Sequence, residues 1–354
     1  MDNFENLSDR KKQILFCTVE DYIKDANPIT SSNIQQRHIK NISTATLRNE
    51  LSALEAMGYL KQLHTSSGRI PTTKAYRLYV NELMKSSKFN KNTLDIVNNL
   101  IFKRTDSLME IISAIASVVS EVTDYPSVVV LNGFDKLIIQ NVKIIPLIDG
   151  NGLCLITTNT GIINNNIKLS EGINEENCND ASKYLSDKFS GKSIGDMIIS
   201  LSDYDNNVGK EIIGFKNIFS NLIACLNDMN GTSRHVQKGM TKLLNNPDYE
   251  DINEARKIFN YLDNNDNIEE IFKDNNSDEE ISFSIGVEND VEELDKCSVI
   301  KANYRVNGQN IASIGVIGPE RMDYSKIAAT LKLITDETKL LDKLEQKENT
   351  DGKK

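Results

Sequence analysis

Hydrophobic residues recur with helical spacing near the start of the chain. A first apolar stripe predicts a helix that begins after Ser8, whose hydroxyl can cap it, and ends before Pro28; the stripe consists of Ile14, Leu15, Val19, Tyr22 and Ile23. A short second helix should start near Thr30 or Ser31, with Ile34 inward. A third should run from a cap at Ser43 or Thr44 to Met57, with Gly58 just beyond its end. This succession predicts a helix-turn-helix.

The third predicted helix has two different faces. Leu47, Leu51 and Leu54 fall on one side of a helical wheel, and the other side is small and polar. Small residues let a helix approach the floor of the DNA major groove, where Asn and Arg can bond base edges. An ordinary solvated helix is the alternative, although it would usually carry more Glu and Lys. The candidate base-reading residues are Ser43, Thr44, Thr46, Arg48 and Asn49.

A short strand pattern follows this helix. Polar and apolar residues alternate from Tyr59 to His64, a turn cluster ends at Gly68, and Arg69-Ile-Pro71 can return as a second strand, which makes a wing. Thr72 or Thr73 should cap another helix, in which we expect Tyr76 and Tyr79 to pack in the core. Contacts to the DNA backbone position a protein without specifying sequence. The candidates for such contacts are Lys40, Ser52, Lys61, His64, Ser66, Arg69, Lys74 and Arg77.

The remaining pattern mixes helices and strands. After a polar connector at 85–104, an apolar helix over 108–122 and a buried strand at 127–131 are predicted. Three strand-like runs between Leu137 and Leu169 are separated by turn signals, which predicts a three-stranded antiparallel meander. Residues 171–245 are mainly helical in pattern, and an apolar stripe from Ile212 to Ile223 suits a core face and a dimer face equally well.

The C-terminal third also alternates between the two kinds of element. It should contain a helix over 252–262 in an acidic region, strands at 281–285, 298–304 and 311–317, and a closing helix from Tyr324 to about Leu344. We expect Arg321 and Asp323 to form a local salt bridge or a helix cap. The fold class is therefore α+β with more than one domain, which agrees with the 354-residue length.

The net charge is informative only when it is counted separately for the two parts of the chain. The net charge of −10 argues against a nucleic-acid-binding protein when the chain is taken whole. Residues 1–89, however, hold 13 basic and 9 acidic side chains, or +4, and the remainder carries −14. A small basic end on a large acidic remainder favours a polyanion-binding module.

The sequence offers no catalytic or metal-binding pattern. The three histidines have no second His or Cys at metal spacing, and phosphate-loop, nucleophile-elbow and zinc-protease motifs are absent. We therefore expect no enzyme activity, no catalytic residue, no metal and no cofactor. Five cysteines without a paired spacing predict a reduced, cytoplasmic protein, and no apolar run is long enough to span a membrane.

Several motifs resemble one family in their order along the chain. They are Ser43-Thr-Ala-Thr-Leu-Arg-Asn-Glu50, Leu54-Glu-Ala-Met-Gly-Tyr-Leu60, His64-Thr-Ser-Ser-Gly-Arg-Ile-Pro-Thr72, Gly286-Val-Glu-Asn289, Cys297-Ser-Val-Ile300 and Gly315-Val-Ile-Gly-Pro-Glu-Arg-Met-Asp-Tyr-Ser325. Together they resemble the heat-inducible transcription repressor family HrcA, which regulates class I heat-shock genes. Thr44 stands where that family commonly has a second Ser, and Glu320 where it commonly has Thr.

The resemblance implies an architecture and a set of partners. It implies a winged helix-turn-helix domain at 1–89, a discontinuous GAF-like domain at 90–136 and 236–345, a dimerising domain inserted at 137–235, and a polar tail at 346–354. It also implies a homodimer on an inverted repeat of double-stranded DNA, the CIRCE operator, inactivation by heat, and a GroEL-type chaperonin as a partner. A ligand-gated winged-helix regulator, with a small molecule bound in the GAF-like domain, is the alternative.

Overall fold

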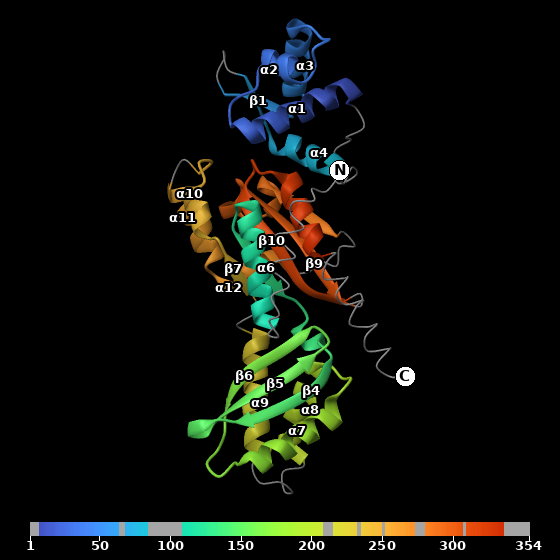
Figure 1. Cartoon of the computed structure of the whole chain (residues 1–354). Helices are drawn as coiled ribbons and strands as arrows, with labels where there is room; N and C mark the ends of the chain where they lie inside the picture. The colour runs from blue at the N-terminus through green and yellow to red at the C-terminus, as the bar shows by residue number, and fades with distance from the viewer. Residues whose placement is uncertain are drawn as a thin grey trace, which may run out of the picture.

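The computed structural model describes residues 7–63, 68–83, 108–207, 215–231, 235–249, 252–272, 280–306 and 309–335. Three parts follow one another along an elongated molecule (Figure 1). The head comprises the described residues up to 83. The body is built around a five-stranded sheet, and the insert comprises the elements between Ile139 and Gly231. The insert lies at the opposite end of the molecule from the head (Figure 1).

The head folds as the pattern predicts. Side chains cap its first three helices: Ser8 Oγ accepts from Lys11 N–H, Thr30 Oγ1 from Asn33 N–H, and Ser43 Oγ from Thr46 N–H. These bonds satisfy N–H groups that the first turn of a helix leaves unpaired. The elements are α1 (Asp9–Asp25), α2 (Ser31–Arg37), α3 (Thr44–Ala56), β1 (Leu60–Gln62), β2 (Arg69–Pro71) and α4 (Thr73–Leu83).

The predicted apolar faces form the core of the head. Ile14, Ile34, Leu47 and Leu54 are fully buried, so that α1, α2 and α3 pack around a common centre. Gly58 follows the end of α3 with φ +78°, a left-handed conformation that costs glycine little. The chain therefore turns sharply after α3 and enters β1, which pairs with β2 as the predicted wing.

The body contains one five-stranded antiparallel sheet in the order β7-β3-β10-β9-β8. Its central strands come from distant parts of the chain, since β3 pairs with β7 on one side and with β10 on the other. The elements are α6 (Leu108–Thr123), β3 (Ser127–Leu131), β7 (His235–Lys238), α10 (Thr241–Asn245), α11 (Ile252–Leu262), α12 (Asn265–Phe272), β8 (Ile281–Ile285), η4 (Gly286–Asn289), η5 (Glu292–Leu294), β9 (Cys297–Val306), β10 (Gln309–Pro319) and a helix over 324–335.

Helices cover both faces of this sheet. Val129 and Leu131 belong to the apolar cluster that includes α6 and the helix over 324–335. Val128 and Val130 belong to a second cluster with residues of α10, α11 and α12. All five residues of β3 are consequently buried, which is why this strand is a continuous apolar run rather than an alternating one.

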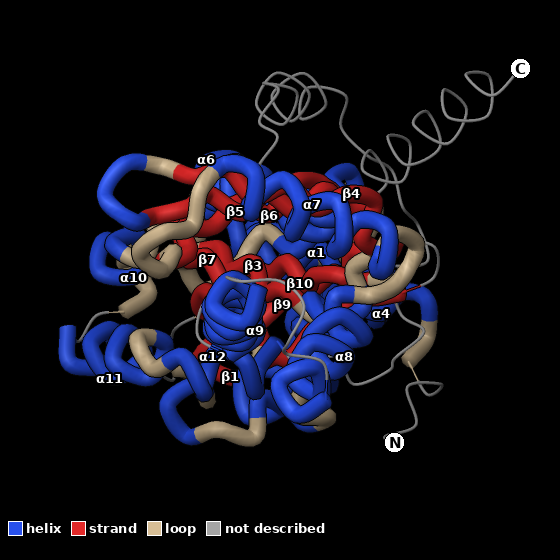
Figure 2. Tube along the Cα trace, turned by 90° about the horizontal axis from the view of Figure 1, so that it is seen from below, coloured by secondary structure: helices blue, strands red, loops and turns tan. Residues whose placement is uncertain are grey.

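The insert contains the predicted three-stranded meander, β4 (Ile139–Pro146), β5 (Asn151–Thr158) and β6 (Gly161–Lys168), in that order. Helix α7 (Glu175–Phe189) lies along the β4 edge of this sheet, where Ser182 and Ser186 accept from backbone N–H groups of β4, and α8 (Ile194–Asn207) and α9 (Phe215–Gly231) complete the insert. Seen from below, α7 lies at the level of the strands and α9 lies to one side of them (Figure 2). Ile144 and Ile156 are buried, whereas Lys143 and Ile145 are exposed, so one face of the sheet packs inward and the other faces outward.

The structure also resolves one alternative and adds two elements. Phe215, Ile218, Phe219 and Leu222 of the apolar stripe are buried within the single chain, and Ile212 lies outside the described residues. The strand β7 falls in the stretch with a mainly helical pattern, because four residues are too few to show a period. The helix over 252–262 is confirmed, and α12 follows it as a separate helix.

Other predicted segments lie partly outside the described residues. These are the connector at 85–104, the turn at Asn307-Gly308 and the end of the closing helix beyond residue 335. Among the residues that are described, no helix combines the length and apolarity needed to cross a membrane.

Candidate DNA-binding surface

Helix α3 turns its small polar face to solvent. Ser43, Arg48, Asn49 and Ser52 are exposed, and the cap bond of Ser43 fixes the first turn of the helix. Thr44 and Thr46 are half-buried, and Thr46 Oγ1 lies 2.9 Å from Ser43 Oγ. All five predicted base-reading residues therefore lie in one short segment at the end of the head that is far from the body (Figure 1). This placement leaves amide, hydroxyl and guanidinium groups available to a groove.

Buried charge holds the helix-turn-helix together behind this face. Asp21 of α1 is only 3% exposed, and its Oδ1 lies 2.9 Å from Nε2 of His38, the residue that ends α2. Arg37 Nη1 lies 3.4 Å from the other oxygen of Asp21. An ion pair of 3.0 Å between Lys11 and Glu50 joins α1 to α3. These contacts fix the turn that precedes α3, and sequence reasoning did not identify them.

The described part of the wing is tied to the helices. Arg69 exchanges backbone hydrogen bonds of 2.8 and 2.9 Å with Ile29, and its Nε lies 2.8 Å from Glu55 Oε2 near the end of α3. Arg69 is therefore half-buried and linked to the recognition helix. His64 and Ser66 of the predicted wing contacts lie outside the described residues.

The other cations of the head differ in their surroundings. Lys40, in the turn before α3, and Lys61, on β1, are exposed. Lys74 is half-buried: its Nζ lies 4.8 Å from the ring centroid of Tyr59 and donates to the carbonyl of Met57. Lys40 and Lys61 are therefore open to solvent, whereas the Lys74 ammonium is engaged just beyond the end of α3.

Arg77 lies on a different side of the head. Its Nε donates to Glu288 Oε1 at 2.9 Å and its Nη2 donates to the carbonyl of Phe283 at 2.7 Å, both in the body. In this structure an intramolecular ion pair takes the place of the expected phosphate contact. Local sequence patterns cannot reveal this ion pair, since Glu288 is more than 200 residues away from Arg77 along the chain.

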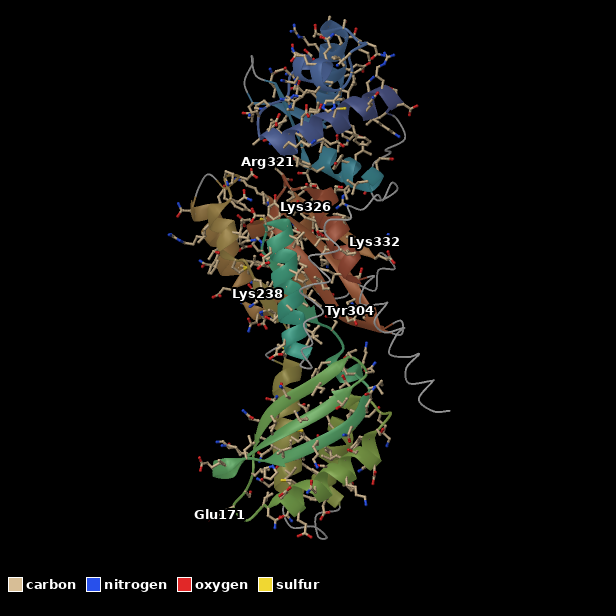
Figure 3. The ribbon with its side chains drawn as sticks, in the orientation of Figure 1. Glu171, Lys238, Tyr304, Arg321, Lys326 and Lys332 are labelled. Atoms are coloured by element: carbon tan, nitrogen blue, oxygen red, sulfur yellow. The ribbon has the colours of Figure 1, made fainter. Side chains whose placement is uncertain are left out.

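Arg321 and Asp323, which we expected to form a local salt bridge or a helix cap, have different partners. Asp323 accepts from the Lys326 N–H and caps the helix over 324–335, as predicted. Arg321 instead contacts Asp248 of the body and the carbonyl of Ile23 in the head, each at 2.8 Å. Figure 3 shows Arg321 between the head and the body.

The described part of the body does not add a site with evident chemistry. Residues of α11 and η5 line a groove of about 680 Å³. Four carboxylates face it together with Lys257 and Lys296. Within the described residues, no group of three or more His, Cys, Asp or Glu could hold a metal ion. Burial raises the pKa of Cys154 and of Cys297 to about 12, so these thiols stay protonated.

A capped recognition helix, a two-stranded wing and an exposed cationic surface define the head as a winged helix-turn-helix, the fold of a DNA-binding transcription regulator. Family models agree with this assignment. Residues 6–85 match the winged helix-turn-helix transcription repressor HrcA DNA-binding model, and residues 109–328 match the HrcA protein C-terminal domain.

Curated relatives cover almost the whole chain. The heat-inducible transcription repressor HrcA of Acetivibrio thermocellus is 32% identical over 94% of this chain and 95% of its own length, and that of Thermoanaerobacter sp. is 32% identical over 94% and 96%. A crystal structure described as a hypothetical protein shares the fold, with a TM-score of 0.70 at 21% identity over 94% of this chain and 98% of its own. The chain belongs to the HrcA family of heat-inducible transcription repressors, which are not enzymes.

Proposed function

We propose that this chain is a dimeric repressor of chaperone genes that binds an inverted-repeat operator of the CIRCE type and loses this binding on heating. The observation that carries the proposal is the outer face of α3, where Ser43, Arg48, Asn49 and Ser52 are exposed together. Ser43, Thr44, Thr46, Arg48 and Asn49 would read bases in the major groove. Lys40, Ser52, Lys61 and Lys74 would contact the backbone, with His64, Ser66 and Arg69 in the wing.

The dimer would form through the insert. Ile145, Leu147 and Ile148 at one end of β4 are exposed apolar side chains, and Ile148 is 84% exposed. Large apolar side chains grouped on a surface are typical of protein interfaces. Two-fold symmetry of the protein would then match an inverted repeat, whose half-sites lie whole helical turns apart.

The order of the elements along the chain supports an assignment of functions to domains. We assign residues 1–89 to DNA binding, 90–136 and 236–345 to a GAF-like domain, 137–235 to a dimerising domain and 346–354 to a polar tail. The insertion of β4 to α9 between β3 and β7 supports this division. A cytoplasmic location and a GroEL-type chaperonin partner complete the proposal, and the names of the relatives support the response to heat.

The packing of the body favours a heat response over control by a bound small molecule. Phe272, Leu294 and Ile317 are fully buried in the cluster that covers one face of the five-stranded sheet. Side chains of the chain itself thus fill the layer between this face of the sheet and α10, α11 and α12. Marginal stability lets a modest rise in temperature open one part of such a protein.

A footprint on the promoter of a chaperonin operon tests the proposal. We expect protection of a symmetric inverted repeat at low temperature and its loss on heating, in parallel with a structural change followed by circular dichroism. A probe with the same base composition but a scrambled repeat is the control. Absence of protection would refute the repressor mechanism. Loss of binding at a temperature well below that of any structural change would refute the heat switch.

A further inference from the structure

The head is seated on the body through buried aromatic rings. Tyr76 of α4 is 2% exposed, and its ring centroid lies 5.8 Å from that of Tyr324, which is fully buried. Phe283 of β8 is a second ring next to Tyr324, with 6.4 Å between the ring centroids. Aromatic contacts of this kind stabilise a structure beyond the apolar area that they bury. We call the surface formed by these rings and the polar contacts around it the joint.

Polar contacts surround the rings and fix the direction of α4 relative to the body. Arg77 makes a two-pronged contact with Glu288 and a third bond to the carbonyl of Phe283. Thr73, at the start of α4, donates to Glu320. A guanidinium that holds a carboxylate through two nitrogens fixes direction as well as distance. The contacts of Arg77 therefore oppose rotation of α4 over the body.

Arg321 completes the joint from the body side. Its Nη1 donates to the carbonyl of Ile23 in the last turn of α1, and its Nε donates to Asp248 Oδ1, each at 2.8 Å. Its side chain is only 17% exposed. Contacts with the body are thus made by both α1 and α4 of the head. Two separate attachments prevent the rotation that a single attachment would allow.

Three separate segments of the body converge on this joint. Asn289 donates to the carbonyls of Gly286, Leu294 and Cys297, which fixes the short helix that presents Glu288. Ser298 Oγ lies 2.8 Å from the Tyr324 hydroxyl. Gly286 has φ +57°, and a side chain there would collide with Glu320. The backbone of the body is thus shaped to receive the head closely.

We propose that Arg77, Glu288 and Arg321 are positioning residues that fix the head on the body and so set the half-site spacing that the repressor accepts. This inference rests on the proposed dimer and its inverted repeat. Two heads held at fixed positions can engage two half-sites together only when the spacing places both on one face of the duplex. Heads that turn freely would tolerate other spacings.

The test compares two DNA duplexes and three full-length proteins. One duplex carries the footprinted inverted repeat, and the other has about five base pairs inserted at its centre, which turns one half-site by about half a helical turn. The proteins are the wild type, Glu288→Ala/Arg321→Ala at the joint, and Glu254→Ala/Lys296→Ala, which removes an exposed ion pair of the body. Both double variants lose one acid and one base, so the net charge is unchanged.

We expect the insertion to weaken wild-type and control binding by about 100-fold or more, because simultaneous engagement of two sites is lost. The joint variant should lose only about tenfold or less, since its heads can reorient. We compare the ratio of the dissociation constants for the two duplexes, because a change in the affinity of a single head affects both constants equally and cancels. An equal ratio for all three proteins would overturn the inference.

Two further measurements separate the causes of failure. If the wild type does not prefer the inverted repeat to a single half-site, the proposed function fails, whatever the joint does. If the joint double variant is misfolded by circular dichroism, Glu288→Gln replaces it, because this change keeps the size of the side chain and removes only the charge. An unchanged spacing ratio in a folded Glu288→Gln protein also counts against the inference.

Discussion

The face that α3 turns outward and the face that α4 turns to the body both carry cationic and hydroxyl side chains. On α3, Arg48 and Asn49 are exposed. On α4, Arg77 is bound to Glu288, and Thr73 to Glu320. In the proposed function the same residue types would therefore serve recognition on one face, while they serve internal docking on the other. Their partners, not their chemistry, distinguish the two roles.

The largest effect should come from the docking face. Tyr76→Ala removes a fully packed ring from the joint, and we expect a loss of about 3–5 kcal/mol in the free energy of unfolding. Tyr79→Ala is the matched control, since that ring is half-buried within the head and contacts Phe16 edge to face. Denaturant unfolding measures both variants. A cost for Tyr76→Ala no greater than for Tyr79→Ala would contradict the docking role.

The recognition face should show its effect in DNA binding and not in stability. We expect Asn49→Ala to lower affinity for the operator by about 1–3 kcal/mol while leaving non-specific binding nearly unchanged, because the amide is proposed to bond a base edge and carries no charge that would release a counterion. Titrations of operator and random-sequence duplexes measure the difference. Asn260→Ala, an exposed amide on α11 in the body, is the control. Equal weakening on both duplexes would remove Asn49 from base reading.

Salt dependence separates the cations of the two faces. Lys61→Ala should reduce the slope of log K against log salt by about 0.9 for each subunit bound, because one phosphate contact is lost. Arg77→Ala removes the same charge from the docking face and should leave the slope unchanged. The measurement is operator affinity over a series of salt concentrations. A slope change for Arg77→Ala as large as for Lys61→Ala would erase the distinction between the faces.

The smallest effect concerns the body that supports the docking face. Burial lowers the pKa of His235 on β7, while Glu269 acts in the opposite direction. The unfolded chain therefore binds a proton more readily, and the contribution of the neutral histidine to stability is lost as the pH falls below its unfolded pKa of about 6.5. We expect His235→Gln to flatten the decline in stability between about pH 7.5 and 5.5. Urea unfolding at both pH values checks this, and an unchanged decline would exclude His235.

Sequence patterns predicted local structure well and long-range contacts poorly. The cap at Ser8, the start of α2 near Thr30, the cap of α3 at Ser43 or Thr44 and the inward face of α3 were predicted because each depends on neighbours within a few residues. The ion pairs of Arg77 and Arg321 could not be predicted, since their partners are brought close only by the complete fold. The strand β7 was missed for the same reason, because its pairing with β3 defines it.

The order of strands in the body has a consequence for synthesis of the chain. The interior strand β3 leaves the ribosome about 100 residues before β7 and about 180 before β10, its two neighbours, which at about 5–20 residues per second is a wait of roughly 10–40 s for the second. Neither edge of this apolar strand has its partner until β7 emerges, and one edge stays unpaired until β10 emerges, a condition that favours aggregation. The head, whose contacts are local, can fold in the meantime. The body is therefore the slow and vulnerable step in making this protein.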